Sequence, residues 1–155
     1  MKRRILAILL LAACLLTLLP ATAMAVPETE TRSKGGKLIA LTFDDGPGPY
    51  TRRLLEGLAK RGVKATFFML GQQAENYDVT AGLVRDAGHQ IASHTYDHPQ
   101  LSKKTDSQVR WQISHTADIL NRITGYGTHY LVRPPYGDYN SRVLSLLDNP
   151  AILWS

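Results

Sequence analysis

Short apolar runs alternate with amphipathic segments along most of the chain after residue 37. Apolar and β-branched runs predict five strands, at 38–43, 65–70, 90–93, 129–133 and 151–154. Apolar residues at helical spacing predict helices between them, at 51–61, 79–87, 105–125 and 141–147. This alternation predicts a parallel α/β sheet with outer helices, either an open sheet or part of a (β/α) barrel.

Capping residues predict where these helices begin and end. Thr51 is expected to cap the first helix and Asp78 the second. Thr105 and Gln108 have the spacing of a capping box, and Gly125 is the expected end of that third helix. The third helix has the clearest pattern in the chain.

Polar side chains follow three of the predicted strands. Asp44 and Asp45 leave the first strand, His94 and His98 follow the third, and Arg133 ends the fourth. The carboxyl ends of parallel strands share one edge of a sheet, so we expect these groups to meet. Neighbouring strand side chains point to opposite faces, which would let one carboxylate bind a metal while the other accepts a proton. One carboxylate and two imidazoles would leave coordination positions open for water and substrate.

Each motif taken alone also has a structural interpretation. The two aspartates with the following Gly and Pro residues are typical of a turn before a helix, the histidines of a surface or capping role, and Arg133 of an ion pair. Two histidines and a carboxylate also form the site of non-haem iron oxygenases. Asp44 and Arg133 have no evident place in that chemistry.

The first 25 residues have the pattern of a targeting segment. Basic residues at 2–4 precede an apolar run at 5–19, which is shorter than the ~20 residues that span a bilayer. An A-x-A signature ending at Ala25 predicts a removed signal peptide and export. A lipobox-like sequence ending at Cys14 is the alternative, and it predicts a lipid-anchored protein. Residues 26–37 are polar and predict a linker before a domain at 38–155.

Cleavage at Ala25 changes the charge of the chain. The full sequence carries a net charge of +5, and three basic residues lie in the targeting segment, which leaves 5 − 3 = +2. This small charge argues against nucleic-acid binding. Cys14 is the only cysteine, so the mature chain would have neither a disulfide nor a thiol nucleophile.

Three segments together resemble a known family. TFDDGP at 42–47, SHTYDHP at 93–99 and RPPYG at 133–137 are similar to the signatures of the NodB-type polysaccharide deacetylases, carbohydrate esterase family four. The resemblance covers residues 37–155 and implies a distorted (β/α) barrel.

The resemblance implies a role for each site residue. The implied metal ligands, commonly for zinc with cobalt, nickel or manganese as alternatives, are Asp45, His94 and His98. Asp44 matches the general base and Arg133 the arginine that orients it and keeps it ionised. The segment from Pro134 to Tyr136 matches the one whose backbone N–H helps bind the oxyanion, and Trp154 matches a tryptophan of the substrate groove.

The implied activity is hydrolysis of N-acetyl groups on peptidoglycan or a chitin-like glycan, with acetyl esters as on xylan as an alternative. The expected partner is an N-acetylated glycan, without nucleic acid or a stable protein partner. The family continues to a Leu-x-His segment whose histidine is the general acid, and this sequence stops at Ser155. His89, His115 and His129 do not take that place and are expected to be surface or packing residues. We therefore expect a truncated, incomplete barrel with impaired turnover; the alternative is a carbohydrate-binding remnant without catalysis.

Overall fold

The computed structural model describes residues 39–127 and 130–154. The predicted signal peptide, the lipobox cysteine and the linker lie outside the described residues, as does His129. The described residues belong to one compact unit that starts at Ile39. Across these two ranges, every helix is too short or too polar to cross a membrane.

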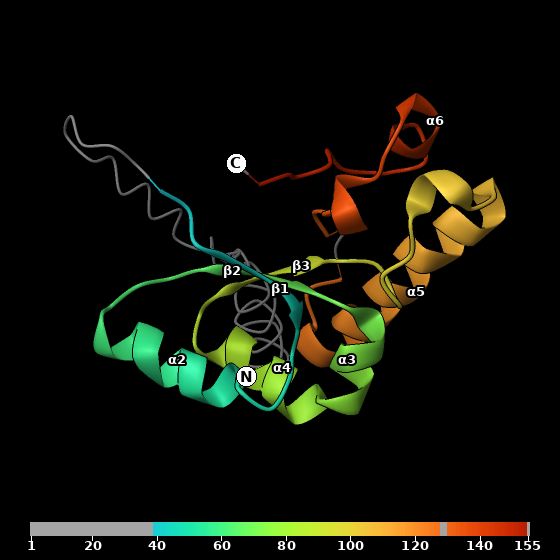
Figure 1. Ribbon diagram of the computed structural model, residues 1–155. Helices are drawn as coiled ribbons and strands as arrows, with labels where there is room; N and C mark the ends of the chain where they lie inside the picture. Colours follow the sequence, from blue (N-terminus) through green and yellow to red (C-terminus); the bar gives the residue numbers. More distant parts are fainter. Residues whose placement is uncertain (1–38, 128–129, 155) are drawn as a thin grey trace, which may run out of the picture. The chain divides into compact units, whose positions relative to one another are not determined.

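Three parallel strands form the sheet in the order β1-β2-β3: β1 (Thr42–Gly46), β2 (Thr66–Met69) and β3 (Gln90–Ser93). Single parallel bridges continue the pairing from Ser93 to Val132 and from Val132 to Ala151. The carboxyl ends of the strands therefore lie along one edge, as the alternating pattern predicts. The predicted α/β class is confirmed, with a partial sheet (Figure 1).

Helices connect the strands and lie beside the sheet (Figure 1). The α-helices are α2 (Thr51–Lys60), α3 (Gly71–Asn76), α4 (Asp78–Asp86), α5 (Asp106–Thr124) and α6 (Ser141–Leu144). Short 3-10 helices are η1 (Leu101–Lys103) and η2 (Pro135–Gly137). The capping box of α5 is confirmed, and so is its end at Gly125, which adopts a left-handed φ of 71°.

Helix α3 is absent from the sequence prediction, because its residues GQQAEN have no apolar periodicity. The helix forms where the chain leaves β2, and it packs against α5. A Cβ atom at Gly71 would lie 2.8 Å from both Thr116 Oγ1 and Tyr96 Cδ2. This close approach of α3 to its neighbours therefore requires glycine at its first position.

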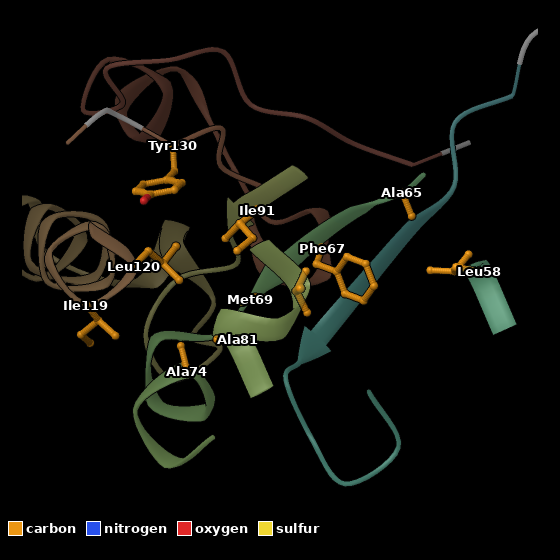
Figure 2. Close-up of a cluster of buried hydrophobic side chains, with 11 residues drawn as sticks. Leu58, Ala65, Phe67, Met69, Ala74, Ala81, Ile91, Ile119, Leu120 and Tyr130 are labelled. Carbon is orange, nitrogen blue, oxygen red and sulfur yellow. The ribbon is translucent and has the colours of Figure 1, made fainter. Parts of the chain in front are cut away.

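The main hydrophobic core lies between the sheet and the helices (Figure 2). Phe67, Met69 and Ile91 of the strands are buried in it with Ile119 and Leu120 of α5. A second cluster joins η1, α5 and the α6 segment through Leu101, Val109, Val143 and Leu146. The two clusters fix the loops that follow β3 to the body of the domain.

Three predicted strands differ from the structure. β1 begins at Thr42 instead of 38 and runs through both aspartates, while Ile39 is 86% exposed. The apolar character of 38–41 signals burial, but β1 lies at the edge of the described sheet and has β2 as its strand partner there. The strands predicted at 129–133 and 151–154 are single bridges in the described part of the chain. Prolines at 134–135 lack the N–H group that would continue the ladder beyond Arg133.

Two predicted caps are also wrong. Thr51 is the first residue of α2, and its Oγ1 accepts a hydrogen bond from Gly48 N at 2.9 Å, outside the helix. Asp78 is the first residue of α4, where its carboxylate accepts from Val79 N at 2.6 Å. Each residue is the first residue of its helix, one position after the N-cap, and its side chain accepts a hydrogen bond at the start of that helix.

Candidate metal centre

Two adjacent carboxylates diverge at the end of β1. The pairing between β1 and β2 is irregular between Phe43 and Gly46, and Asp45 has a left-handed φ of 65°. Such a backbone is strained for a residue other than glycine, and it persists where the surrounding structure enforces it. As a result Asp44 reaches Arg133, while Asp45 reaches two histidines.

Asp45, His94 and His98 form a compact cluster of possible metal ligands, and each offers one ligand atom within 4.8 Å of the others. Asp45 Oδ1 lies 3.5 Å from His94 Nε2 and 3.4 Å from His98 Nε2. Ligand atoms ~2.0–2.1 Å from a tetrahedral zinc ion would lie roughly 3.3 Å apart. The donor set and its spacing therefore fit a divalent cation such as zinc.

The two histidines lie on a loop, residues 94–98, which we call the metal loop. Residues four positions apart can share one side of a helical turn, but Thr95 and His98 have left-handed φ values of 70° and 63°, so this loop is not helical. Pro99 disfavours helical backbone at His98, and the loop instead folds back so that both rings contact at 5.0 Å.

Gln112 of α5 holds the metal loop in this conformation. Its side-chain carbonyl accepts from Tyr96 N at 2.8 Å and more weakly from Asp97 N at 3.4 Å, and its amide donates to Asp97 Oδ1 at 2.7 Å. The residue is 5% exposed. The sequence analysis did not single out Gln112. The indication in the sequence is that this polar residue lies three positions after Val109, on the apolar face of the helix.

His94 is buried and held in one tautomer. Its Nδ1 lies 2.7 Å from the carbonyl oxygen of Arg133, and a carbonyl can only accept, so Nδ1 carries the proton. Nε2 is then left with its lone pair toward Asp45. Burial lowers the pKa of His94 below its ordinary value, although the Arg133 carbonyl and the charges of Asp44 and Asp45 oppose this. The ring is thus kept neutral, as metal binding requires.

Arg133 joins the second carboxylate to the core. Its Nη1 donates to Asp44 Oδ1 at 2.7 Å and to Thr42 Oγ1 at 2.9 Å, and its guanidinium lies 3.9 Å from the centre of the Phe68 ring. Further hydrogen bonds reach the carbonyls of Ile152 and Leu153, each at 3.3 Å. With its side chain 3% exposed, the arginine is a fixed positive charge beside Asp44.

The remaining predicted residues surround the cluster. The Tyr136 ring packs edge-on against His98 with centroids 4.5 Å apart, and the residue has a left-handed φ of 59°. Pro134 is buried between Arg133 and η2. The Trp154 ring lies 5.8 Å from the guanidinium of Arg133, and the residue is 54% exposed. The structure thus brings all eight predicted site residues into one region, while their roles stay predictions.

The other two described histidines do not enter the site. His89 is buried, and its Nδ1 accepts a hydrogen bond from Ala65 N at 3.2 Å. His115 stacks on Trp111 with centroids 4.7 Å apart. Both have the packing role expected for them, whereas His129 lies outside the described residues.

A protein-family model matches most of this chain. Residues 31–150 match the family model described as polysaccharide deacetylase. The chain belongs to the polysaccharide deacetylase family. This membership argues against a non-haem iron oxygenase, the alternative that two histidines and a carboxylate left open.

Other members of the family are similar to this chain over part of their length. It is 46% identical over 101 residues to a peptidoglycan-N-acetylglucosamine deacetylase of Bacillus cereus, covering 64% of this chain and 36% of that protein. It is 43% identical over 129 residues to a chitin deacetylase of Pestalotiopsis sp, covering 81% of this chain and 40% of that protein. This chain therefore spans little more than a third of these curated relatives.

A solved structure extends the likeness to three dimensions. The peptidoglycan deacetylase PdaC from Bacillus subtilis superposes with a TM-score of 0.74 at 38% identity, covering 78% of this chain and 60% of that one. This similarity confirms the predicted fold class, a partial (β/α) barrel of the deacetylase type.

Proposed function

We propose that this chain is a metal-dependent hydrolase that removes N-acetyl groups from a glycan. Peptidoglycan is the first candidate and a chitin-like polymer the second, in keeping with the names of its relatives. The observation that carries the proposal is the cluster of Asp45, His94 and His98 directly beside the Asp44–Arg133 pair. A purely structural ion pair has no need of such a cluster.

Asp45, His94 and His98 would hold the cation, with zinc as the first candidate and cobalt, nickel or manganese as alternatives. When bound, a divalent cation supplies Lewis-acid polarisation of the amide carbonyl and lowers the pKa of an attacking water. The chain supplies three ligands and leaves further coordination positions open. The Arg133 carbonyl accepts the Nδ1 proton of His94, which leaves the lone pair of Nε2 available to the cation.

Asp44 would act as the general base. Its carboxylate follows the ligand Asp45 by one position, on the opposite side of the chain, so it can take a proton from water without binding the metal. The buried Arg133 holds this carboxylate in one orientation through a hydrogen bond of 2.7 Å.

The rim of the site would bind the rest of the substrate. Tyr136 lies on η2 with a backbone held in the left-handed region, beside His98. We assign its segment, which begins at Pro134, to stabilisation of the carbonyl oxygen as negative charge develops. The exposed face of Trp154 is suited to stacking on a sugar ring.

A carbohydrate-binding protein without turnover is the second candidate. It is favoured by one observation: among the described residues, His94 and His98 are the histidines at the site, and both are assigned to the metal. No described histidine is then left to protonate the leaving amine. The two functions differ in whether bound glycan releases acetate.

Acetate release from N-acetylglucosamine oligomers and from peptidoglycan fragments, with zinc or cobalt added, tests the proposal. We expect Asp44→Asn to reduce kcat by ~10²–10⁴-fold while metal binding persists, since general base catalysis contributes about that factor. Asp45→Asn should instead abolish stoichiometric metal uptake in calorimetry. Glycan binding without acetate would favour the second candidate, and full activity of Asp44→Asn would refute the assigned base.

Export remains a separate proposal. We propose that the chain acts outside the cytoplasm after cleavage at Ala25, with a lipid anchor at Cys14 as the alternative. Intact mass of the mature protein distinguishes the two, because an acylated chain would begin at Cys14.

A further inference from the structure

A hollow of about 480 Å³ opens at the edge of the metal centre. Its lining residues are His98, Pro99, Gln100, Lys103, Lys104 and Tyr136. Two of them belong to the site: His98 is a proposed metal ligand, and the Tyr136 ring packs against it. A ligand that reaches the metal centre therefore lies next to this hollow.

The hollow is positively charged. Lys103 and Lys104 line it, and its lining contains no carboxylate. Three acidic residues, Asp97, Asp106 and Asp138, lie close along the chain to this lining, and each has another partner. Asp138 accepts hydrogen bonds from Ser102 N at 2.8 Å and Ser102 Oγ at 2.7 Å. Asp97, next to His98, accepts from Gln112 Nε2 at 2.7 Å, and Asp106 pairs with Arg142 at 2.6 Å. In the part of the chain that the structure describes, none of these three carboxylates forms an ion pair with Lys103 or Lys104.

The backbone that carries the lysines is fixed. Lys103 N and Lys104 N donate to the carbonyls of Gln100 and Leu101, at 3.2 and 3.1 Å. Arg142 donates to the carbonyl of Lys104 at 2.9 Å from the α6 side. Leu101, fully buried, anchors η1 in the second core cluster. The two lysines that line the hollow are therefore carried by a backbone held in place by hydrogen bonds and by the second core cluster.

We propose that this hollow is a carboxylate-binding subsite, which holds an acidic group on the sugar next to the one that is deacetylated. The inference rests on the proposed function, because it places the reacting sugar at the metal centre. A polysaccharide is longer than one sugar, so its chain continues over the rim beside His98. Lysine ammonium groups bind a carboxylate as flexible point charges and impose no bidentate geometry.

The ligand chemistry is a carboxylate in a glycan, and two sources carry it. One is the lactyl group of N-acetylmuramic acid, and the other is the peptide attached to that lactyl group. A chitin-like polymer or an acetylated xylan backbone without acidic substituents has no group for the subsite. The hollow would thus set a preference for acidic over neutral glycans.

The kinetic test compares soluble oligomers of equal length with the metal-loaded full chain. The substrates are a neutral chitin oligomer, a muramic acid oligomer without peptides, and the same oligomer with its peptides. In Lys103→Gln/Lys104→Gln we expect the preference in kcat/KM for acidic over neutral oligomers to fall about 10-fold, through KM, since each exposed charge pair contributes modestly. Added salt should weaken the preference of the parent protein in the same direction.

Two variants control this experiment. Lys103→Arg/Lys104→Arg keeps both charges and should keep the preference, which separates charge from packing. Lys60→Gln removes an exposed lysine from the last turn of α2, outside the hollow, and should leave the preference unchanged. If the double Gln variant loses preference only for the oligomer with peptides, the bound group is a peptide carboxylate. If it also loses preference for the oligomer without peptides, the bound group is the lactyl carboxylate.

A binding measurement separates this inference from the proposed function. In the Asp44→Asn background, calorimetry should show tighter binding of the acidic oligomer than of the neutral one, and the double Gln variant should remove the difference. Lysine-dependent binding without acetate release from the parent protein would refute the proposed function and keep the subsite. Acetate release with equal affinity for acidic and neutral oligomers would overturn the subsite.

Discussion

The two carboxylates at the end of β1 are neighbours in sequence and opposite in surroundings. Asp44 is 29% exposed at its side chain and bound to an arginine that is 3% exposed; we call this pair the arginine side. Asp45 is 64% exposed between His94 and His98; this triad is the histidine side. The arginine side carries a permanent positive charge, whereas on the histidine side burial lowers the pKa of His94, which favours its neutral ring. The difference teaches that partners, more than residue type, assign a carboxylate its chemistry.

One residue connects the two sides. The side chain of Arg133 binds Asp44, and its backbone carbonyl accepts the Nδ1 proton of His94. Because Arg133 contacts both sides, testing their difference requires variants that disrupt the arginine side and the histidine side separately. The side chain of Arg133 is expected to act on the fold, and the contacts of the metal loop on the affinity for metal.

Replacing Arg133 by Met has the largest expected effect on stability. It removes the donor to Asp44, Thr42 and the carbonyls of Ile152 and Leu153. Loss of one partner of a buried ion pair costs about 3–5 kcal/mol, and because Asp44 is partly exposed we expect a loss of ~3 kcal/mol here. Urea unfolding of the metal-free protein measures the change.

A matched control is Arg122→Met. Arg122 lies 3.5 Å from Glu75, and their side chains are 62% and 38% exposed. Exposed pairs of this kind contribute about 0–1 kcal/mol. Equal losses of stability in the two Met variants would contradict the buried, structural character of the arginine side.

Replacing Gln112 by Ala should act on the histidine side. The variant leaves the N–H groups of Tyr96 and Asp97 without their side-chain acceptor and releases the metal loop. We expect zinc affinity to fall about 10–100-fold, as for residues that orient metal ligands. The expected loss of stability is ~1–2 kcal/mol, from the unpaired groups. Calorimetric zinc titration and urea unfolding give the two values.

Ser114→Ala is the control for this variant, because Ser114 is exposed on the same helix and takes part in no contact with the metal loop that the structure describes. It should change neither quantity. Unaltered zinc affinity in Gln112→Ala would show that the loop conformation does not depend on α5.

His89 lies outside the site, so it can be used to test how acid affects the stability of the fold. Burial, with a smaller contribution from the charge of Lys64, lowers the pKa of His89 below its ordinary value of 6.5. The unfolded chain then binds more protons than the folded protein between these two pKa values. The free energy of unfolding therefore falls as the pH drops below about 6.5 and through the lowered pKa.

His89→Gln keeps a hydrogen-bond acceptor for Ala65 N and removes the titrating group. Urea unfolding between pH 7 and 5, in the presence of a chelator, should show a shallower loss of stability than in the parent protein. The lowered pKa of His94 contributes a loss of the same sign in both proteins, so their difference isolates His89. Identical slopes would contradict a neutral, buried His89.

Much of the fold was predictable from local patterns. The capping box of α5, the strand β3 at 90–93 and the parallel alternation are all confirmed, because caps and periodicity depend on residues a few positions apart. Helix α3 lacks such a pattern. Gly71, its first residue, packs closely against Tyr96 and Thr116. The residues of α3 alone do not predict a helix.

The candidate site divides in the same way. The sequence alone determined which residue types follow the strands, and the parallel topology predicted that those strand ends would meet. Only the tertiary structure decided which carboxylate faces which partner, that Gln112 holds the metal loop, and that His94 and Arg133 share a hydrogen bond. The physical reason is that these choices depend on left-handed backbone angles at Asp45, Thr95 and His98, and on contacts such as Asp44 with Arg133 across 89 positions of the chain. A local pattern contains no information about such distant partners.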